Sequence, residues 1–343
     1  MKLKLHSPGA KAGKPAAGVM GFLEKRRWLG ATLLLLVLAV APVISSAEQR
    51  PAAKEGVRGI RTSNKVVLTG PEGDPFDMPS DAAVGPEGDL YILDGVHHRV
   101  VVYDAEGKFR FQFGSRGVEP GQLLYPLGIA VSPDAKVYVA DSGNHRVQTF
   151  TSNGQPLDVI TLAAGPSGTP ADPTDVVVDP ARDRIYIADN DNHCILVYNL
   201  AGRSFKAVWG GPGQGERQFR FPFLMDITPQ GYLLVVEPIN TRVQVLNPSG
   251  KFVNFIGGWG VKAGQLFRPK GVATCEDRAF VTDSYLGSVQ VFDMSGSFLG
   301  VLADDGGLPM KFTTPTGITV DAKHKRLYVV ELKAHRVCRV DLE

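Results

Sequence analysis

Residues 125–150, with the sequence YPLGIAVSPDAKVYVADSGNHRVQTF, contain the pattern from which the fold can be predicted. It contains three short apolar runs, at 128–131, 137–140 and 147–150, and polar turns separate them. Short β-branched runs that are bounded by Gly, Pro, Asp and Asn predict antiparallel strands. A fourth run, at 157–162, follows the next turn. The stretch therefore predicts one small meander of four strands.

The same pattern recurs six times along the chain. A Pro opens each unit, and an acid ends its second predicted strand, with successive acids spaced 46–48 positions apart. The prolines are Pro79, Pro126, Pro173, Pro222, Pro269 and Pro315, and the acids are Asp94, Asp141, Asp189, Glu237, Asp283 and Glu331. Repeats of this period, with four strands each, are typical of a radially closed propeller. We therefore predict an all-β fold, a six-bladed β-propeller of four-stranded antiparallel blades, with an open solenoid as the alternative.

The sixth unit is expected to lack its fourth strand. A turn glycine follows the acid by 13 residues in five units, and the same spacing in the sixth unit points one position beyond Glu343. A spare strand, NKVVLT at 64–69, resembles the fourth strands at 108–113 and 251–256. Because an unpaired edge invites mispairing, we predict that residues 64–69 pair with residues 337–342 and close the last blade. An open solenoid would explain neither the missing strand nor the spare one.

The N-terminal residues have the features of an export signal. Three basic residues, 25–27, precede an apolar run at 28–44, and the small residues Ser-Ser-Ala follow at 45–47. This order is typical of a secretory signal peptide, while the run is also close to the length that spans a bilayer. Residues 1–47 are thus predicted to be a signal peptide or a signal anchor, with Met20 as a possible second start. Residues 48–63 are predicted to be a polar linker, and residues 64–343 the propeller.

Charge and cysteine content narrow the function classes. Residues 1–47 hold seven of the 37 basic residues and one of the 35 acidic ones, so the remainder has a net charge of −4. A mildly acidic protein is a poor nucleic-acid partner, because phosphate contacts require basic patches. The three cysteines, Cys194, Cys275 and Cys338, lie in different units, which argues against a disulfide framework. No cofactor is expected.

The second turn of each unit carries a shared motif. The six turns read DGVHHRV, DSGNHRV, DNDNHCI, EPINTRV, DSYLGSV and ELKAHRV. This series resembles the NHL repeat, whose turn has an acid, a Gly/Asn turn, and Asn-His-Arg before a β-branched residue. The resemblance covers about residues 79–343, and it implies a six-bladed propeller.

The acid and the Arg five residues later are expected to form a charge-assisted bond that fixes the turn. Four units have both residues: Asp94/Arg99, Asp141/Arg146, Glu237/Arg242 and Glu331/Arg336. Cys194 and Ser288 replace the Arg in the other two units. We therefore expect Asp189 and Asp283 to meet a ligand more readily than the other acids do.

The residue before the Arg is a histidine in four units, at His98, His145, His193 and His335. A shared metal is disfavoured, because equivalent positions of a ring lie too far apart for coordination at about 2.0–2.1 Å. The Gly-rich connectors 114–126, 210–222 and 257–269 are expected on the same face as these turns. We predict that this loop-rich face, with Arg116, Arg217 and Trp259, is the partner surface.

The predicted inner strands bear on enzymatic alternatives. The resemblance extends to amidating lyases, whose zinc histidines follow the opening Pro; the residues here are Ser80, Leu127, Thr174, Phe223, Lys270 and Thr316. None is His, which disfavours a zinc lyase. Asp81, Asp175 and Asp226 could serve a lactonase-like calcium site, but the full ligand set is not evident from the sequence. Asp226 also stands alone among small residues in its slot, which makes it a binding candidate, and a streptogramin-lyase-like activity stays open.

These observations favour an exported, non-enzymatic scaffold, periplasmic or extracellular, or anchored to the inner membrane by residues 28–44. It would bind a protein, peptide or glycan through its loop-rich face as a monomeric propeller, with no nucleic acid and no metal. The candidate binding residues are His98, His145, His193, His335, Asp189, Asp283 and Asp226, and no catalytic residue is assigned. The alternative is a propeller lyase or hydrolase with its site in the central channel.

Overall fold

The computed structural model describes residues 57–165 and 168–343. The predicted signal segment, 1–47, and the first part of the predicted linker lie outside the described residues. The regular secondary structure of the described chain is almost entirely β, with 24 strands. Its short 3₁₀ helices are η1 (Ser142–Asn144), η2 (Pro180–Arg182) and η3 (Leu332–Ala334). No helix in this part of the chain has the length and hydropathy of a membrane span.

Four antiparallel sheets of four strands follow one another along the chain. Each is a meander that runs from an inner strand to an outer one, as the sequence predicts. The first has β2 (Pro79–Val84), β3 (Leu90–Asp94), β4 (Arg99–Tyr103) and β5 (Phe109–Phe113). The second has β6 (Gly128–Val131), β7 (Val137–Asp141), β8 (Arg146–Phe150) and β9 (Pro156–Thr161). The third has β10 (Pro173–Asp179), β11 (Arg184–Asp189), β12 (Cys194–Asn199) and β13 (Phe205–Gly210). The fourth has β14 (Met225–Ile227), β15 (Leu233–Glu237), β16 (Arg242–Leu246) and β17 (Phe252–Ile256).

The remaining strands form one eight-stranded sheet in the order β18-β19-β20-β21-β1-β24-β23-β22. Its first meander has β18 (Pro269–Cys275), β19 (Arg278–Asp283), β20 (Ser288–Asp293) and β21 (Phe298–Ala303). Its second has β22 (Pro315–Asp321), β23 (Arg326–Glu331) and β24 (Arg336–Leu342). The strand β1 (Gly59–Leu68) lies between the two meanders.

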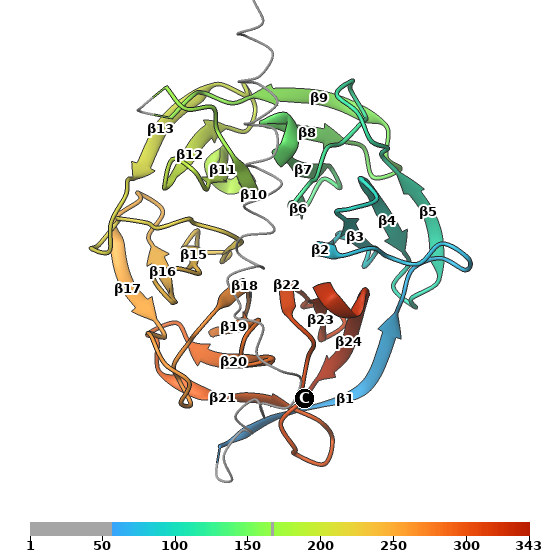
Figure 1. Cartoon of the computed structure of the whole chain (residues 1–343), viewed down its shortest axis with the longest axis vertical. Helices are drawn as coiled ribbons and strands as arrows, with labels where there is room; N and C mark the ends of the chain where they lie inside the picture. The colour runs from blue at the N-terminus through green and yellow to red at the C-terminus, as the bar shows by residue number, and fades with distance from the viewer. Residues whose placement is uncertain (1–56, 166–167) are drawn as a thin grey trace, which may run out of the picture. The chain divides into compact units, whose positions relative to one another are not determined.

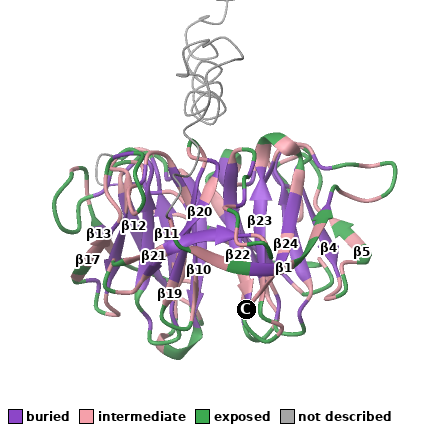
Figure 2. Ribbon diagram, turned by 90° about the horizontal axis from the view of Figure 1, so that it is seen from below, coloured by how far each residue is buried: buried purple, intermediate pink, exposed green. Residues whose placement is uncertain are grey.

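β1 pairs with both of its neighbours (Figures 1 and 2). Its second part, Thr62–Leu68, is antiparallel to β24, which confirms the predicted pairing of residues 64–69 with residues 337–342. Its first part, Gly59–Arg61, is parallel to β21, a pairing that the sequence did not predict. The linker prediction is therefore wrong for residues 59–63. Residues 59–61 pair with β21, and the buried Thr62 side chain donates a hydrogen bond to the Ala303 carbonyl at 2.8 Å, so this segment is part of the sheet.

The sheets stand around a central axis as the blades of a propeller (Figure 1). The inner strands β2, β6, β10, β14, β18 and β22 lie next to the axis, and β2 contacts β22 as well as β6. An open solenoid would separate the first inner strand from the last, so the alternative architecture is excluded.

Buried side chains of neighbouring blades pack against each other and form the core. Figure 2 shows the buried residues along the strands of the blades. The second strand of a blade is almost wholly buried, whereas the outer strands are partly exposed. A large side chain three residues before each repeated acid lies in this core. These side chains are Tyr91, Tyr138, Tyr186, Leu234, Phe280 and Tyr328, each at most 2% exposed. The repeat therefore places both the packing residue and the acid on the same strand.

Candidate functional site

Five of the six repeated acids bind the connector that leads into their blade through a backbone N–H, and Glu237 instead accepts side-chain hydrogen bonds from its own blade. All six acids end the second strand of their blades, and each is fully buried, with 0% relative exposure. The Asp141 carboxylate accepts the Leu124 backbone N–H at 2.7 Å, and Asp94 accepts that of Asp77 at 2.8 Å. Both donors belong to the connector that leads into the blade. Because the connector is held at the strand end, the acids determine how the loop-rich face is built.

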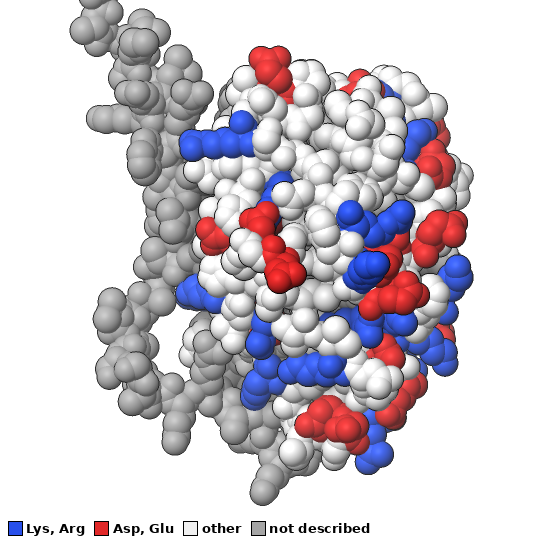
Figure 3. Space-filling model, turned by 90° about the vertical axis from the view of Figure 1, so that its right-hand side faces the viewer, with Lys and Arg blue, Asp and Glu red and all other residues white. Residues whose placement is uncertain are grey.

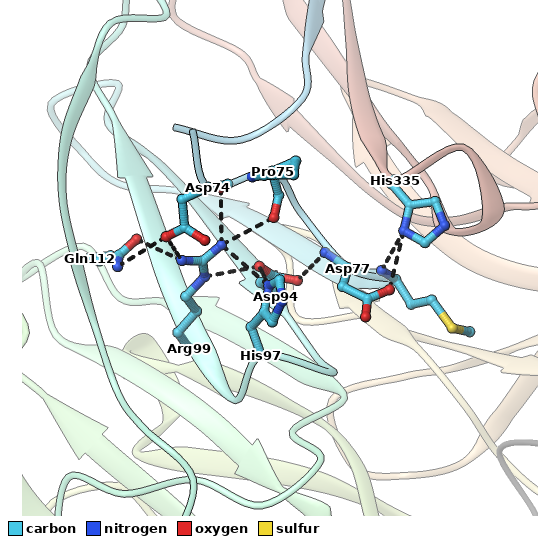
Figure 4. A network of polar contacts seen from close by, with 9 residues as sticks. Asp74, Pro75, Asp77, Asp94, His97, Arg99, Gln112 and His335 are labelled. Atoms are coloured by element: carbon cyan, nitrogen blue, oxygen red, sulfur yellow. Dashed lines mark hydrogen bonds and ion pairs between the residues drawn. The ribbon is translucent and has the colours of Figure 1, made fainter. Parts of the chain in front are cut away.

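The predicted acid–arginine pairs are present in all four blades that have both residues. The paired residues face each other directly across the second and third strands. The distances from the Arg Nε to the carboxylate are 2.9 Å for Asp94/Arg99, 2.7 Å for Asp141/Arg146, 2.5 Å for Glu237/Arg242 and 2.6 Å for Glu331/Arg336. Figure 4 shows that Arg99 also contacts Asp74 and Gln112. This confirms the structural role of the motif.

The two acids without an arginine are also fully partnered. Asp189 accepts the Asp172 N–H at 3.0 Å and the Asn192 amide at 2.9 Å. Asp283 accepts the backbone N–H groups of Phe267, Arg268, Tyr285 and Leu286. The inference that a missing arginine frees the carboxylate for a ligand therefore does not hold, because backbone and amide N–H groups replace the guanidinium. Burial raises the pKa of Asp189.

The four histidines of the repeat connect neighbouring blades. Each has a positive φ, between 52° and 56°, at the end of the turn. The Nδ1 atoms of His98, His193 and His335 accept backbone N–H groups from the connector of the next blade at 3.0–3.1 Å, and His145 Nδ1 lies 2.8 Å from a connector carbonyl oxygen. The contact of His335 joins the last blade to the first (Figure 4).

His98 is the most buried of these histidines, at 5% exposure. Its burial, and then the nearby Arg116 charge, lower its pKa. A neutral ring suits its role, because Nδ1 must be unprotonated to accept the Tyr125 N–H. The described residues contain no group of three or more His, Cys, Asp or Glu side chains placed to hold a metal ion.

The central channel contains a cavity of about 310 Å³. Three carboxyl groups on inner strands, those of Asp81, Asp175 and Asp226, line it. Each accepts a backbone N–H from the inner strand of the following blade. The donors are Ile129 at 3.1 Å, Met225 at 2.6 Å and Thr274 at 2.6 Å, and the Thr274 hydroxyl adds a bond to Asp226 at 2.7 Å. These aspartates thus link adjacent blades at the axis.

Burial dominates the electrostatics of the channel. It raises the pKa of Asp226 to about 6, and it raises the pKa values of Asp81 and Asp175. Repulsion from Asp226 adds to the shift of Asp81, and repulsion from Asp81 and Asp226 adds to that of Asp175. Carboxyl groups with raised pKa values can hold and release protons near neutral pH. From the sequence, Asp226 is a candidate binding residue, whereas Asp81 and Asp175 are only members of an incomplete set of calcium ligands.

From the sequence, Lys270 bears only on the zinc-lyase alternative, which it helps to disfavour. Its ammonium nitrogen lies 4.6 Å from the centre of the Phe223 ring. Burial is the main cause that lowers its pKa to about 8, and the neighbouring Arg268 charge adds to the effect. It is the single titratable side chain among the six residues that follow the opening prolines.

The loop-rich face exposes large apolar side chains. They lie in the connectors and in the turns between second and third strands. They are Val118, Ile239, Trp259, Val261, Tyr285 and Leu308, with exposed fractions from 43% for Tyr285 to 73% for Trp259. Glutamine side chains from the third strands bind the connectors. Gln148 Oε1 accepts the Gly121 N–H at 2.9 Å, and Gln290 Oε1 accepts the Gly264 N–H at 2.9 Å. The exposed side chains therefore stand on fixed loops.

Comparison of the sequence with known proteins finds the NHL repeat at residues 76–103, 123–150 and 171–198. The chain is 45% identical over 51 residues to protein brain tumor of Drosophila melanogaster, and 34% identical over 78 residues to RING finger protein nhl-1 of Caenorhabditis elegans. These matches cover 15% and 23% of this chain but only 5% and 8% of the relatives. They therefore show the repeat and not the function of a whole protein.

Solved structures with the same fold share little sequence with the chain. A streptogramin B lyase has a TM-score of 0.60 at 12% identity, over 82% of this chain and 98% of that one. A Bacteroides thetaiotaomicron protein has a TM-score of 0.61 at 14% identity, over 86% and 75%. The hydrazine synthase of Kuenenia stuttgartiensis has a TM-score of 0.56 at 14% identity, over 78% and 96%. At such identities the likeness shows the fold alone. The chain therefore carries NHL repeats, and its fold is the β-propeller fold of these structural neighbours.

Proposed function

We propose that this chain is an exported, non-enzymatic scaffold that binds a protein, peptide or glycan through its loop-rich face. We further propose that its ring has six blades. In that count β18–β21 form the fifth blade, and β22–β24 form the sixth, which β1 completes at its outer edge. The parallel pairing of β1 with β21 joins these two blades into one sheet.

The observation that carries the proposal is the set of exposed apolar side chains on the loop-rich face. Isolated exposed apolar residues are ordinary, but a group on one face favours an interaction site. Trp259, at 73% exposure, is the most exposed large hydrophobic side chain in the described part of the chain. Aromatic side chains of this kind supply most of the binding energy at many interfaces.

The repeated residues support a scaffold, because they have structural roles. Five of the acids hold connectors, Glu237 pairs with Arg242, and the histidines link blades, so neither set is free for chemistry. Figure 3 shows one side of the ring, where basic and acidic side chains are interspersed. Such mixed charge does not favour a phosphate backbone on that side. We propose a monomeric protein that does not bind nucleic acid.

Site-specific photocrosslinking tests the proposed surface in the native cell. A benzophenone amino acid placed at Trp259 should crosslink to one partner, because this side chain stands on the proposed face. The matched control is the same amino acid at Leu157, which is 50% exposed on the outer strand β9. Crosslinks at both positions alike, or none at Trp259, would contradict the proposal.

A lyase or hydrolase that acts in the channel is the second candidate. The observation that favours it is the 310 Å³ cavity with three carboxyl groups, where burial raises the pKa of Asp226 to about 6. A carboxyl group with such a pKa suits general acid–base catalysis. Turnover in a panel of lyase, esterase and lactonase substrates, with loss in Asp226→Asn and retention in Trp259→Ser, would favour the enzyme over the scaffold.

Export is proposed from residues 1–47 alone. N-terminal sequencing of the protein from the periplasm or medium decides between a cleaved signal and an anchor. A mature chain that starts near residue 48 is expected after cleavage, whereas a chain that keeps residues 28–44 and fractionates with membranes supports the anchor. A chain found only in the cytoplasm would overturn the proposal of export.

A further inference from the structure

We infer that the loop-rich face binds an acidic peptide and that Lys270, at the mouth of the central channel, holds one of its carboxylates. This inference rests on the proposed scaffold function, and it specifies the chemistry of the partner and the residue that anchors it. No motif of the repeat requires a lysine at this position, where the other blades have Ser80, Leu127, Thr174, Phe223 and Thr316.

Lys270 lies between the channel cavity and the loop-rich face. Two segments that line the cavity are Val272–Thr274, on β18, and Leu224–Ile227. Lys270 comes just before the first segment in the sequence, and Phe223 comes just before the second. Both residues follow directly on the prolines at which the connectors end. The ammonium group of Lys270 rests 4.6 Å from the centre of the Phe223 ring, which comes from the preceding blade. The cation is thus held at the channel end that the connectors surround.

The lysine has no anionic partner of its own. Within residues 57–165 and 168–343, no carboxylate forms an ion pair with Lys270, and its ammonium group makes no hydrogen bond. The charge of Asp283 acts to raise the pKa of Lys270, but the Asp283 carboxylate already accepts hydrogen bonds from four backbone N–H groups. A partly desolvated cation without a counter-ion costs free energy. A carboxylate from a ligand would relieve this cost and form a charge-assisted hydrogen bond.

The loops around Lys270 carry a matching surface, which we call the Lys270 sector. It consists of the connectors 211–222 and 257–268, the turns 238–241 and 284–287, and the residues Phe223 and Lys270. Its basic side chains are Arg217, Arg220, Lys262, Arg268 and Lys270, against a single acid, Glu216. This charge balance contrasts with the net −4 of residues 48–343, and it is complementary to an acidic partner.

The apolar side chains of the sector favour a peptide over a nucleic acid. Ile239, Trp259, Val261 and Tyr285 are all at least 43% exposed in these loops. Aromatic rings can stack on bases, but the branched aliphatic side chains of Ile239 and Val261 offer no such contact and suit apolar side chains of a peptide. The sector therefore fits a segment in which acidic and apolar residues alternate.

Fluorescence anisotropy with defined probes tests this inference on the full chain. The probe is a fluorescein-labelled hexapeptide of alternating Asp and Leu, and the comparison probes are its Asn–Leu counterpart and hexauridylate. We expect the Asp–Leu peptide to bind and the Asn–Leu peptide to bind at least about 10-fold more weakly, as for loss of a charged hydrogen bond. Lys270→Met should weaken binding of the Asp–Leu peptide about 10-fold. Lys206→Met, an exposed lysine on the outer strand β13, is the matched control and should leave binding unchanged.

A second readout does not depend on a variant that must fold. In the unmodified protein, the NMR titration of the Lys270 side chain should shift to higher pH when the Asp–Leu peptide is added, because a bound carboxylate stabilises the charged form. An unchanged titration at saturating peptide would overturn the inference.

Other outcomes separate the anchor from the proposed function. If Trp259→Ser loses the peptide and Lys270→Met does not, the binding face stands and the lysine anchor is wrong. If hexauridylate binds more tightly than the peptide, the acidic-peptide assignment is overturned in favour of nucleic acid. If no probe binds, the inference fails, while the crosslinking result at Trp259 still decides the scaffold proposal independently.

Discussion

Removal of a single repeated acid should destabilise the propeller far more than removal of an exposed one. Asp141 is fully buried, and its carboxylate accepts four hydrogen bonds: from the Leu124 backbone N–H at 2.7 Å, Arg146 Nε at 2.7 Å, Asn144 Nδ2 at 2.9 Å and Gln148 Nε2 at 3.0 Å. The substitution Asp141→Ala leaves these donors without their acceptor and leaves the Arg146 guanidinium, whose side chain is 13% exposed, without its counter-ion.

The expected magnitude follows from burial. Removal of one partner from a buried ion pair costs about 3–5 kcal/mol, because the remaining charge stays desolvated. The same unit provides a matched control in the pair of Asp134 and Lys136, whose side chains are 59% and 44% exposed. An exposed pair contributes about 0–1 kcal/mol, so Asp134→Ala should change the free energy of unfolding by no more than that.

Equilibrium unfolding in urea, followed by circular dichroism, measures both variants. The double variant Asp141→Ala with Arg146→Met should lose less than the sum of the two single losses, because it removes the unpaired cation. If Asp141→Ala unfolds at the same free energy as Asp134→Ala, the buried acids do not hold the blade together as argued.

Three further predictions concern the axis and the closing strand. Gly128→Ala should destabilise the protein by about 1–3 kcal/mol, because the new Cβ would lie 2.6 Å from the Asp175 Cα. Gly211→Ala is the control, since its new Cβ meets nothing within 4 Å. Equal melting temperatures of the two variants would count against this packing. The folded-state pKa of Asp226 is raised to about 6 from 3.8, so the folded state favours the neutral carboxyl group. The contribution of this neutral group to the free energy of unfolding is fully present below pH 3.8 and is lost as the pH rises through about 6. Asp226→Asn should therefore gain stability relative to the wild type between pH 4 and pH 7, and parallel stability–pH profiles would refute the shift. Deletion of residues 1–68 should expose the edges of β21 and β24, so that the protein associates and elutes earlier in size-exclusion chromatography. Deletion of residues 1–56, which keeps β1, should leave the protein monomeric. A monomer in both cases would show that β1 is dispensable for closure.

The candidate site was only partly accessible from the sequence. The acid–arginine pairs could be predicted because the two residues stand directly opposite each other in one hairpin, so their distance follows from local spacing. The partners of Asp189 and Asp283 could not be predicted in this way. Their hydrogen bonds come partly from connector N–H groups, and every residue except proline carries such a group, so the sequence leaves no trace of the contact.

The amino-acid sequence by itself determined the repeating four-stranded unit, the strand ends and the pairing of residues 64–69 with residues 337–342, since each depends on local periodicity or on a strand that lacks a partner. The three-dimensional arrangement was needed to establish that β1 also pairs with β21, that Asp81, Asp175 and Asp226 line one cavity, and that the Lys270 ammonium group lies over the Phe223 ring. These contacts join different blades, or blades to the closing strand, and their geometry depends on how the blades are arranged around the axis. A pattern within one unit carries no information on that arrangement.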